Sequence, residues 1–276
     1  MKKNRIITVL LLKNGFLVQS RLFSRYQNLG NPVTSVKRFS DWAADELIYL
    51  DITRDNVYDM HRDDLGHPNR NNIIEIISDA ARKCYIPVTF GGRIRTMEDI
   101  ETRLANGADK ISINTKALDS PLFIKEASRE FGSQCIVVSI DVKIKESSYV
   151  VMSNGGRTAA SYDPIRWAKT VEENGAGEIL LNSIDRDGAG NGYDIDLLHS
   201  VSNAVNIPVI ACGGAGTWEH FAEALDKTRV DAVAAANIFQ YIDQSVYLAR
   251  KYLFDKGYNV RSPDLMLEKE DSRAIL

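Results

Sequence analysis

Residues 44–55, ADELIYLDITRD, and residues 176–187, AGEILLNSIDRD, align without a gap and share a glutamate, an isoleucine, an arginine and an aspartate. Two further pairs follow in the same order: IPVTFGG (86–92) with IPVIACGG (207–214), and DKISINT (109–115) with DAVAAANIF (231–239). The second copies lie about 120 to 130 residues downstream of the first, which indicates a duplicated half of a larger architecture.

Short apolar runs that favour β-strands alternate with amphipathic helical patterns such as NPVTSVKRFSDWA and DPIRWAKTVEENG. Eight strands alternating with helices over about 250 residues predict a (β/α)8 TIM barrel. Alternation alone leaves a doubly wound sheet open, but the internal repeat favours the barrel. The strand candidates are 6–12, 47–52, 86–90, 110–113, 136–141, 178–182, 209–212 and 232–236.

The predicted domain organisation is one barrel over residues 1–262, made of halves of about 1–131 and 132–262, and a charged tail over 263–276. With 44% hydrophobic residues, 26% charged residues and a net charge of −3, the composition is that of a globular protein. The mild negative charge disfavours nucleic acid or an anionic membrane as partner, and no apolar run reaches the roughly 18 residues of a membrane span.

The N-terminal stretch MKKNRIITVLLLKNG starts with basic residues, but its apolar run meets a charge and a turn without a small-residue cleavage site. We therefore expect a first strand and not a signal peptide. The three cysteines, Cys84, Cys135 and Cys212, lie far apart in apolar stretches, which favours reduced core cysteines in a cytoplasmic protein.

Glycines and asparagines end matching strands in the two halves. Gly91-Gly92 follows one predicted strand and GGAG at 213–216 follows its repeat, while Asn114 and Asn237 end another matching pair. Small residues at strand ends let backbone N–H groups approach an anion, although tight turns alone explain either glycine pair. Because the arrangement occurs twice, we expect two phosphate sites on opposite sides of the mouth, and hence a long substrate with a phosphate at each end.

Charged residues mark the opposite ends of four strands. Arg5, Glu46, Lys110 and Glu178 stand at or near the starts of their strands, two of each sign. They are either solvated strand ends or a ring of ion pairs over the barrel floor, and the sequence leaves both possibilities open.

The runs ADELIYLDIT, GADKISINT, GAGEILLNSIDRDG and GGAG, with SIDRDG followed by GYD, resemble the HisF family, the cyclase subunit of imidazole glycerol phosphate synthase. The resemblance covers residues 4 to about 262. It implies a (β/α)8 barrel without a cofactor or metal. It also implies that a class I glutaminase of the HisH kind docks at the floor, with Asp109 as a docking charge. The ammonia gate would be formed by Arg5, Glu46, Lys110 and Glu178. It also implies phosphate or substrate binding by Gly92, Asn114, Thr115, Asp187, Gly188, Gly213, Gly214 and Asn237.

The chain departs from the family pattern at the catalytic pair. The family uses two aspartates as general acid and base; Asp141 matches one, but Leu11 stands at the other. Gln19 replaces a lysine, Arg93 replaces the third glycine of a GGG run, and Asn182 replaces a threonine. Asn237 stands where a serine is usual and can still donate to a phosphate.

An insertion lies within residues 54–72, RDNVYDMHRDDLGHPNRNN. Its His61 and His67, near Asp63 and Asp64, match no known metal-ligand spacing, so we expect a polar loop without a metal. Lys13 either ends the first strand or touches substrate, and the sequence does not separate these roles.

Three functions remain open. The first is a synthase subunit of a glutamine amidotransferase that supplies ammonia for a surface sugar, with or without a third, sugar-modifying protein. Related HisF-like proteins serve surface polysaccharide pathways, and their first strand resembles this leucine-rich one. The second is the cyclase of histidine biosynthesis, a lyase that forms imidazole glycerol phosphate and AICAR. The third is a barrel that only activates its glutaminase. Leu11 favours the first, because ring closure needs an acid and a base together.

Overall fold

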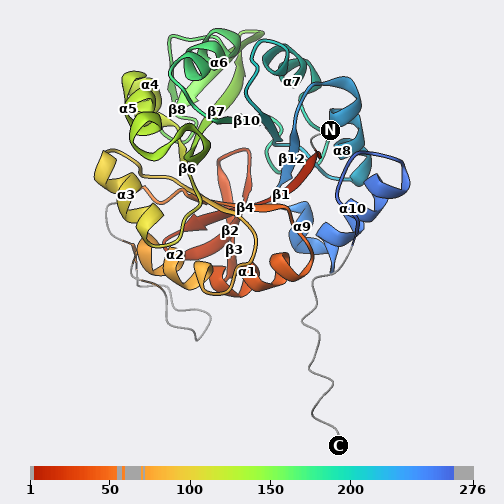
Figure 1. Ribbon diagram of the computed structural model, residues 1–276. Helices are drawn as coiled ribbons and strands as arrows, with labels where there is room; N and C mark the ends of the chain where they lie inside the picture. Colours follow the sequence, from red (N-terminus) through yellow and green to blue (C-terminus); the bar gives the residue numbers. More distant parts are fainter. Residues whose placement is uncertain (1–2, 55–57, 60–69, 71, 264–276) are drawn as a thin grey trace, which may run out of the picture.

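The computed structural model describes residues 3–54, 58–59, 70 and 72–263, and the statements below concern these residues. Eight parallel strands form a closed barrel surrounded by helices, which confirms the predicted (β/α)8 fold (Figure 1). Each strand pairs with its neighbour, and the pairing of β7 with β10 closes the ring. In order around the barrel the strands are β1 (Arg5–Lys13), β4 (Glu46–Asp51), β5 (Val88–Gly91), β6 (Lys110–Ile113), β7 (Ile136–Lys145), β10 (Glu178–Ser183), β11 (Val209–Cys212) and β12 (Ala232–Ala235).

The helices lie outside the barrel, and the predicted helical patterns all fall on helices. The two patterns that begin with Asn-Pro and Asp-Pro start in the same way, because Asn31 and Asp163 cap their helices and a proline occupies the first turn. The helices are α1 (Pro32–Asp41), α2 (Ile73–Ala81), α3 (Met97–Ala105), α4 (Thr115–Asp119), α5 (Leu122–Phe131), α6 (Pro164–Glu173), α7 (Ile195–Ser202), α8 (Trp218–Lys227), α9 (Ile238–Tyr241) and α10 (Ser245–Asp255), with a 3₁₀ turn at Ser133–Cys135.

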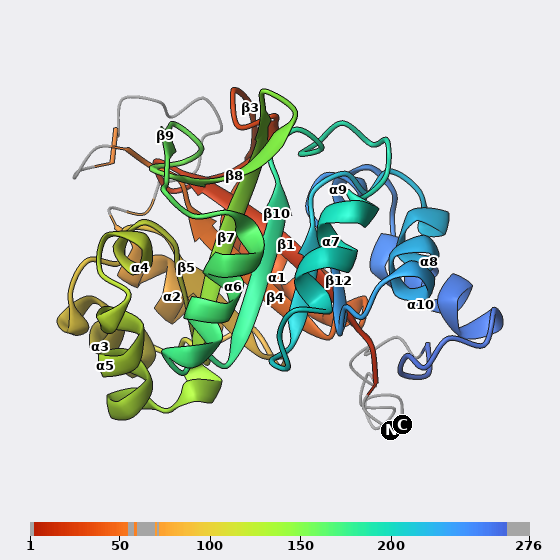
Figure 2. The ribbon, with the colours of Figure 1, turned by 90° about the horizontal axis from the view of Figure 1, so that it is seen from above.

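Two antiparallel hairpins extend beyond one end of the barrel, and the sequence analysis did not predict them. One comprises β2 (Phe16–Arg21) and β3 (Arg25–Gly30); the other comprises the end of β7, β8 (Ser148–Ser153) and β9 (Thr158–Ala159). Figure 2 shows β3, β8 and β9 together at this end, which we call the mouth. The Asn14-Gly15 turn, with φ of 51° and 78°, carries the usual sequence signal of a hairpin.

Side chains alternate along each strand between the helix layer and the barrel interior. On β1, Ile6, Leu10 and Leu12 pack in the large core under the helices. The interior of the barrel holds a second apolar cluster. We call this cluster the middle layer; it consists of Ile7, Val9, Leu11, Val18, Ile48, Val137, Leu180, Ile210, Ala232 and Ala234. The barrel therefore encloses a packed core and not an open pore.

Aspartates that precede three strands fasten the end of the barrel opposite the mouth, which we call the floor. Asp45 accepts a hydrogen bond from the N–H of Ile6 at 2.8 Å, and Asp109 accepts one from Val88 at 2.8 Å. Asp231 does the same for Val209. These carboxylates accept hydrogen bonds from N–H groups at strand starts. Asp109 and Asp231, which match in the repeat, therefore have the same structural role.

Among the described residues, no helix is both long and apolar enough to cross a bilayer.

Candidate functional site

Arg5, Glu46, Lys110 and Glu178 form a closed ring of ion pairs at the floor, and not separate solvated strand ends. Each cation contacts both glutamates: Lys110 Nζ lies 2.9 Å from Glu46 and 3.0 Å from Glu178. Arg5 lies 2.9 Å from Glu46 and also pairs with Glu178. The glutamate side chains are 2% and 7% exposed, whereas the two cations keep about a fifth of their surface.

The alternating signs stabilise the charged forms of the ring. Burial alone lowers the pKa of Arg5, but Glu178 and Glu46 outweigh it and leave the pKa raised. Lys110 behaves in the same way: burial lowers its pKa, and the two glutamates raise it overall. A hydroxyl completes the ring, because Thr89 donates to Glu46 at 2.7 Å. The ring is thus a neutral, hydrogen-bonded closure of the barrel axis.

Leu11 lies in the barrel interior and lines the mouth, as expected. Its side chain is 8% exposed and belongs to the middle layer, which separates the floor ring from the mouth. On β10 the inward side chains change from Glu178 through Leu180 to Asn182, so that strand delivers a polar group to the mouth. On β1 the inward side chains change from Arg5 through Ile7 and Val9 to Leu11, so that strand delivers an apolar group to the cavity.

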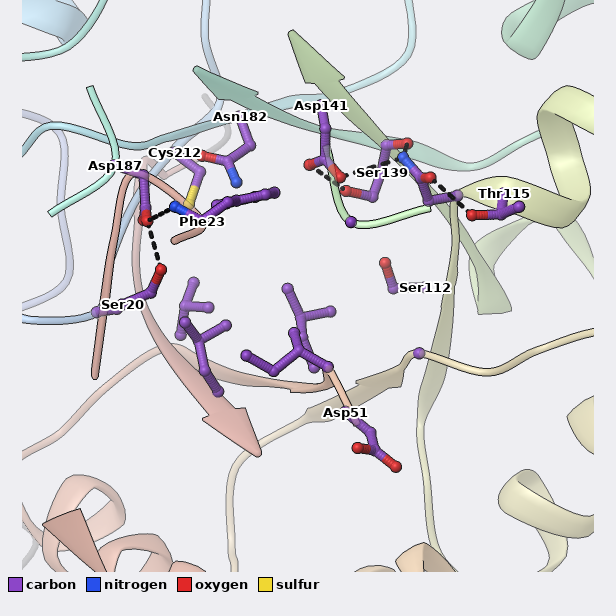
Figure 3. Close-up of a pocket in the computed structure, with 18 of the residues that line it drawn as sticks. Ser20, Phe23, Asp51, Ser112, Thr115, Ser139, Asp141, Asn182, Asp187 and Cys212 are labelled. Atoms are coloured by element: carbon purple, nitrogen blue, oxygen red, sulfur yellow. Dashed lines mark hydrogen bonds between the residues drawn. The ribbon is translucent and has the colours of Figure 1, made fainter. Parts of the chain in front are cut away.

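The mouth contains a cavity of about 580 Å³. Figure 3 shows Asp141, Ser139 and Thr115 on one side of the opening and Asp187 with Ser20 on the other. Nearly all of the sequence-predicted mouth residues line this cavity, as do several that the sequence analysis did not single out. The predicted residues in the lining are Leu11, Gly92, Asn114, Thr115, Asp141, Asp187, Gly188, Gly213, Gly214 and Asn237.

Asp141 is the buried carboxyl of the mouth, 9% exposed. It accepts hydrogen bonds from Ser139 Oγ at 3.3 Å and Asn114 Nδ2 at 3.3 Å. Desolvation raises the pKa of Asp141 to about 7, opposed by hydrogen bonds from Ser139 and Asn182 and reinforced by the negative charge of Asp187. Desolvation therefore outweighs the loss of a neighbour at Leu11, and Asp141 is suited to both accepting and donating a proton near neutral pH.

Asp187 supplies a second carboxylate to the mouth, and its negative charge adds to the rise in the pKa of Asp141. Its carboxylate accepts from Ser20 Oγ at 2.7 Å and from the N–H of Phe23 at 3.4 Å, so it also holds the β2–β3 hairpin to the barrel. Burial raises the pKa of Asp187, and these hydrogen bonds act in the opposite direction. Ser20 and Asp187 lie 167 residues apart in the chain, so sequence reasoning had no signal for the contact.

The two predicted asparagines use their amides on the protein itself. Asn114 Nδ2 donates to the carbonyl of Ser139 at 3.0 Å besides its contact with Asp141, and Asn237 Nδ2 donates to the carbonyl of Ser20 at 2.7 Å. Thr115 accepts from the N–H of Asn154 at 3.1 Å. The asparagines therefore position strand ends and the two hairpins, and phosphate binding by their amides stays a prediction.

Glycine is required at both predicted phosphate positions by close backbone approach. Gly92 has φ of +92°, and a Cβ there would lie 2.1 Å from the carbonyl oxygen of Asp51. Gly214 has φ of +110°, and a Cβ would lie 2.1 Å from the carbonyl oxygen of Gly192. Gly213 repeats the Gly92 contact in the other half, because a Cβ there would lie 2.7 Å from the carbonyl oxygen of Ser183, which the alignment places opposite Asp51. The following helices, α3 and α8, begin only at Met97 and Trp218, so the glycines do not themselves lie at helix N-termini.

Arg93 and Asp51 form a second charged group that the repeat did not reveal, since the alignment places Ser183 opposite Asp51. The Asp51 side chain is fully buried, accepts from Tyr58 Oη at 2.9 Å and lies 3.9 Å from Arg93. Arg93 has φ of +59°, a conformation that costs a non-glycine residue about 1 kcal/mol or more.

The remaining singled-out residues lie outside the cavity lining. Gln19 faces the outer side of its hairpin, where it donates to Gln27 and accepts from Tyr241 at 2.8 Å. Lys13 ends β1 with its ammonium 4.7 Å from the centre of the Tyr26 ring. Asp109 is exposed at the floor. Of the departures from the family pattern, Arg93 and Asn182 line the cavity, whereas Gln19 does not.

His61, His67, Asp63, Asp64 and the tail 264–276 lie outside the described residues, as does Asp55 of the repeat. Within the described part of the chain, no group of three or more histidines, cysteines or acids is placed to hold a metal ion.

Comparison with known proteins assigns the chain to a family. The model of the family described as "Histidine biosynthesis protein" matches residues 5–244. The chain is 43% identical over 259 residues to the imidazole glycerol phosphate synthase subunit HisF of Geobacillus kaustophilus, covering 93% of this chain and 98% of that protein. Proteins of the same name from Hydrogenobaculum sp. and Sulfurisphaera tokodaii are 43% and 44% identical, over 95% of this chain and their full lengths. From its barrel, its mouth and these matches, the chain belongs to the HisF proteins of the histidine biosynthesis family.

Proposed function

We propose that the chain is the synthase subunit of a glutamine amidotransferase of the imidazole glycerol phosphate synthase kind. It receives ammonia at the floor from a class I glutaminase and uses it at the mouth on a phosphorylated acceptor. One observation carries the proposal: a neutral ring of four charges, the apolar middle layer and a carboxyl-bearing cavity follow one another along a single barrel axis.

The floor suits the docking of a partner. The four ring charges face this end, Asp109 is exposed beside Lys110, and Tyr85, which precedes β5, is 82% exposed. A large exposed aromatic side chain next to charged groups is typical of interface residues. Ammonia entering here would have to displace ion pairs of the ring, so the ring would act as its gate.

The mouth suits proton transfer to and from the acceptor. With a pKa near 7, Asp141 is poised to take a proton from the attacking nitrogen and to return one to a leaving oxygen. The middle layer behind it excludes water from the path of ammonia. The tight glycine crossings at Gly92 and Gly214 leave backbone close to the cavity on both sides, where phosphates would bind.

Two kinds of acceptor are candidates for the reaction at the mouth. The precursor of imidazole glycerol phosphate is favoured by the 43–44% identity to HisF proteins over nearly the full chain, and it is the better supported of the two. A different acceptor, such as a surface sugar aminated with the help of a third protein, is favoured by Leu11, which removes one of the two family aspartates. The three cysteines carry no disulfide, consistent with the cytoplasmic location that we propose for either route.

The test is a glutaminase assay with the class I glutaminase encoded by the same genome. We expect co-purification with this chain and stimulation of glutamine hydrolysis, and we expect Lys110→Glu to uncouple the ammonia so produced from use at the mouth. Free ammonium should bypass that defect. A chain that neither binds nor stimulates such a glutaminase would contradict the proposal.

A further inference from the structure

The positive charges of the mouth gather on one side of the cavity. All the lysines and arginines of the described lining come from the segments that directly follow β4, β5 and β6, including helix α4, and from the β8–β9 turn. The lining residues contributed by β1, β2, β10, β11 and β12 include none. We call this side the basic wall; it consists of Arg54, Arg93, Arg95, Lys116 and Arg157. On the opposite side, an anion would meet backbone groups and small side chains, beside the carboxylate of Asp187.

Arg93 is held in place at the centre of this wall. The preceding residue, Gly92, packs against the backbone of Asp51 so tightly that no side chain fits there. The carboxylate of Asp51 is itself fixed by Tyr58 Oη at 2.9 Å and by the N–H of Thr53 at 3.0 Å. At 3.9 Å its attraction orients the Arg93 guanidinium without a hydrogen bond between this pair. A side chain kept at positive φ beside a cavity is a mark of functional constraint.

The β8–β9 hairpin brings a further cation to the same side. Its Asn154 donates to Thr115 at 3.1 Å, next to Lys116, and the carbonyl of Asn154 accepts from Arg157 Nε at 2.7 Å. The hairpin is therefore fastened to the end of β6, which places Arg157 and Lys116 on one edge of the cavity. Three acids, Asp51, Asp119 and Asp141, also line this side, so the five positive charges remain in excess.

The excess of positive charge on the basic wall is larger than one phosphate group requires. A single phosphate carries about two charges at neutral pH and is commonly held by backbone N–H groups with one cation. The side with Gly188 and Gly214 offers backbone N–H groups to a single phosphate, but no lysine or arginine of the described lining. The basic wall spans several loops and matches a longer, more highly charged group.

We propose that the basic wall binds a diphosphate group of the acceptor and that Arg93 is the residue that selects it over a single phosphate. The inference rests on the proposed function in taking the mouth as the place where the acceptor binds. It favours the second of the two acceptors, because the precursor of imidazole glycerol phosphate carries its phosphates singly, one at each end.

The test is isothermal titration calorimetry with inorganic pyrophosphate and inorganic phosphate at matched ionic strength. The wild-type chain should bind pyrophosphate at least about tenfold more tightly than phosphate, because one extra charge-assisted hydrogen bond is worth about that factor. Arg93→Gly should remove most of this preference while weakening phosphate binding by less than about threefold. Arg93→Lys keeps the charge but not the planar fork, so its preference should be intermediate.

The matched control is Arg25→Ala, which removes an exposed arginine of the hairpin at the same end of the barrel and outside the cavity lining. It should leave the ratio of the two affinities unchanged. Thermal unfolding should show that Arg93→Gly remains folded, since glycine accepts a φ of +59° without strain. A wild-type chain that binds the two anions equally, or an Arg93→Gly chain that keeps the full preference, would overturn the inference.

The failure of this inference is distinguishable from failure of the proposed function. Stimulation of the glutaminase depends on the floor and should be the same in the wild type and in Arg25→Ala, which lies outside the cavity lining. If the glutaminase responds but pyrophosphate is not preferred, the inference fails and the function stands. If pyrophosphate is preferred through Arg93 but no glutaminase responds, the basic wall stands and the amidotransferase role fails.

Discussion

The two ends of the barrel treat buried charge in opposite ways. At the floor, two cations and two glutamates contact one another in a closed ring, and the pKa values of Arg5 and Lys110 are raised. At the mouth, within the described part of the chain, no lysine or arginine forms a salt bridge with Asp141 or Asp187, and the pKa values of both carboxyls are raised by desolvation. The floor therefore stabilises the charged forms of its residues, and the mouth destabilises the charged forms of Asp141 and Asp187.

This difference separates a structural closure from a chemical site. A paired buried charge is costly to break and cannot easily exchange its proton, which suits a gate. An unpaired buried carboxyl has its pKa moved toward neutrality, which suits proton transfer. The predictions below test each end, from the largest expected effect to the smallest.

The largest effect is expected at Leu11, where a second carboxyl would complete the mouth. Leu11→Asp should raise ammonium-dependent formation of imidazole glycerol phosphate by about 10²–10⁴-fold, the usual contribution of a general acid or base. The assay uses free ammonium and the bisphosphate precursor, so no glutaminase is needed. Leu11→Asn is the control of similar size that cannot exchange a proton in this range.

The outcome also separates the two acceptors. A wild-type rate that Leu11→Asp does not improve would show that the mouth already has the groups it needs for cyclisation. No product from either chain, with the glutaminase still stimulated, would favour the other acceptor.

A broken floor ring should cost stability but should leave the ammonium-dependent chemistry of the mouth intact. Lys110→Met leaves Glu46 and Glu178 with only Arg5 between them, and removing one partner of a buried ion pair costs about 3–5 kcal/mol in the free energy of unfolding. The control is Lys251→Met, which removes an exposed cation paired with Asp255 on α10 and should cost less than about 1 kcal/mol. Urea denaturation measures both. Equal losses in the two variants would mean that the ring is solvated and not a closure.

The sequence predicted the barrel, and it left the floor ring open as one of two interpretations of the four charges; several contacts at the mouth it did not predict. Strand positions follow from apolar runs, and charges at four strand starts meet because all barrel strands begin at the same end. The β2–β3 hairpin escaped prediction because β3, RYQNLG, is partly exposed and lacks a clear apolar alternation. The contacts of Asp187 with Ser20 and of Asp51 with Arg93 were also missed, since they join distant loops and depend on geometry that no local pattern encodes.

The pH dependence of stability should come from the mouth, at Asp141. Its pKa is about 7 in the folded chain against 3.8 for an ordinary aspartate. Between these values the folded state keeps a proton that the unfolded state has lost, so the free energy of unfolding falls as pH rises and levels off above about pH 7. The fall attributable to Asp141 should be roughly 2–4 kcal/mol and absent from Asp141→Asn. Urea denaturation at about pH 5 and about pH 8 measures it; parallel losses in both chains would assign the slope to other groups.

The smallest effect is expected from the interaction between the two mouth carboxyls. Asp187 raises the pKa of Asp141, but it ranks last among the causes, behind desolvation and two hydrogen bonds. Asp187→Asn removes the charge and keeps an oxygen that can accept from Ser20 Oγ, so the β2–β3 hairpin should stay attached. The pKa of Asp141 should then fall by less than about one unit, or 1.4 kcal/mol. Carbon-13 NMR titration of the side-chain carboxyls resolves such a shift.

Asp185→Asn is the matched control, because Asp185 precedes Asp187 by two residues, accepts from the N–H of Ile144 at 2.6 Å and does not line the cavity. It should leave the titration of Asp141 in place, so an equal shift in both variants would mean that a general change of the loop, and not the Asp187 charge, sets the pKa of the catalytic candidate.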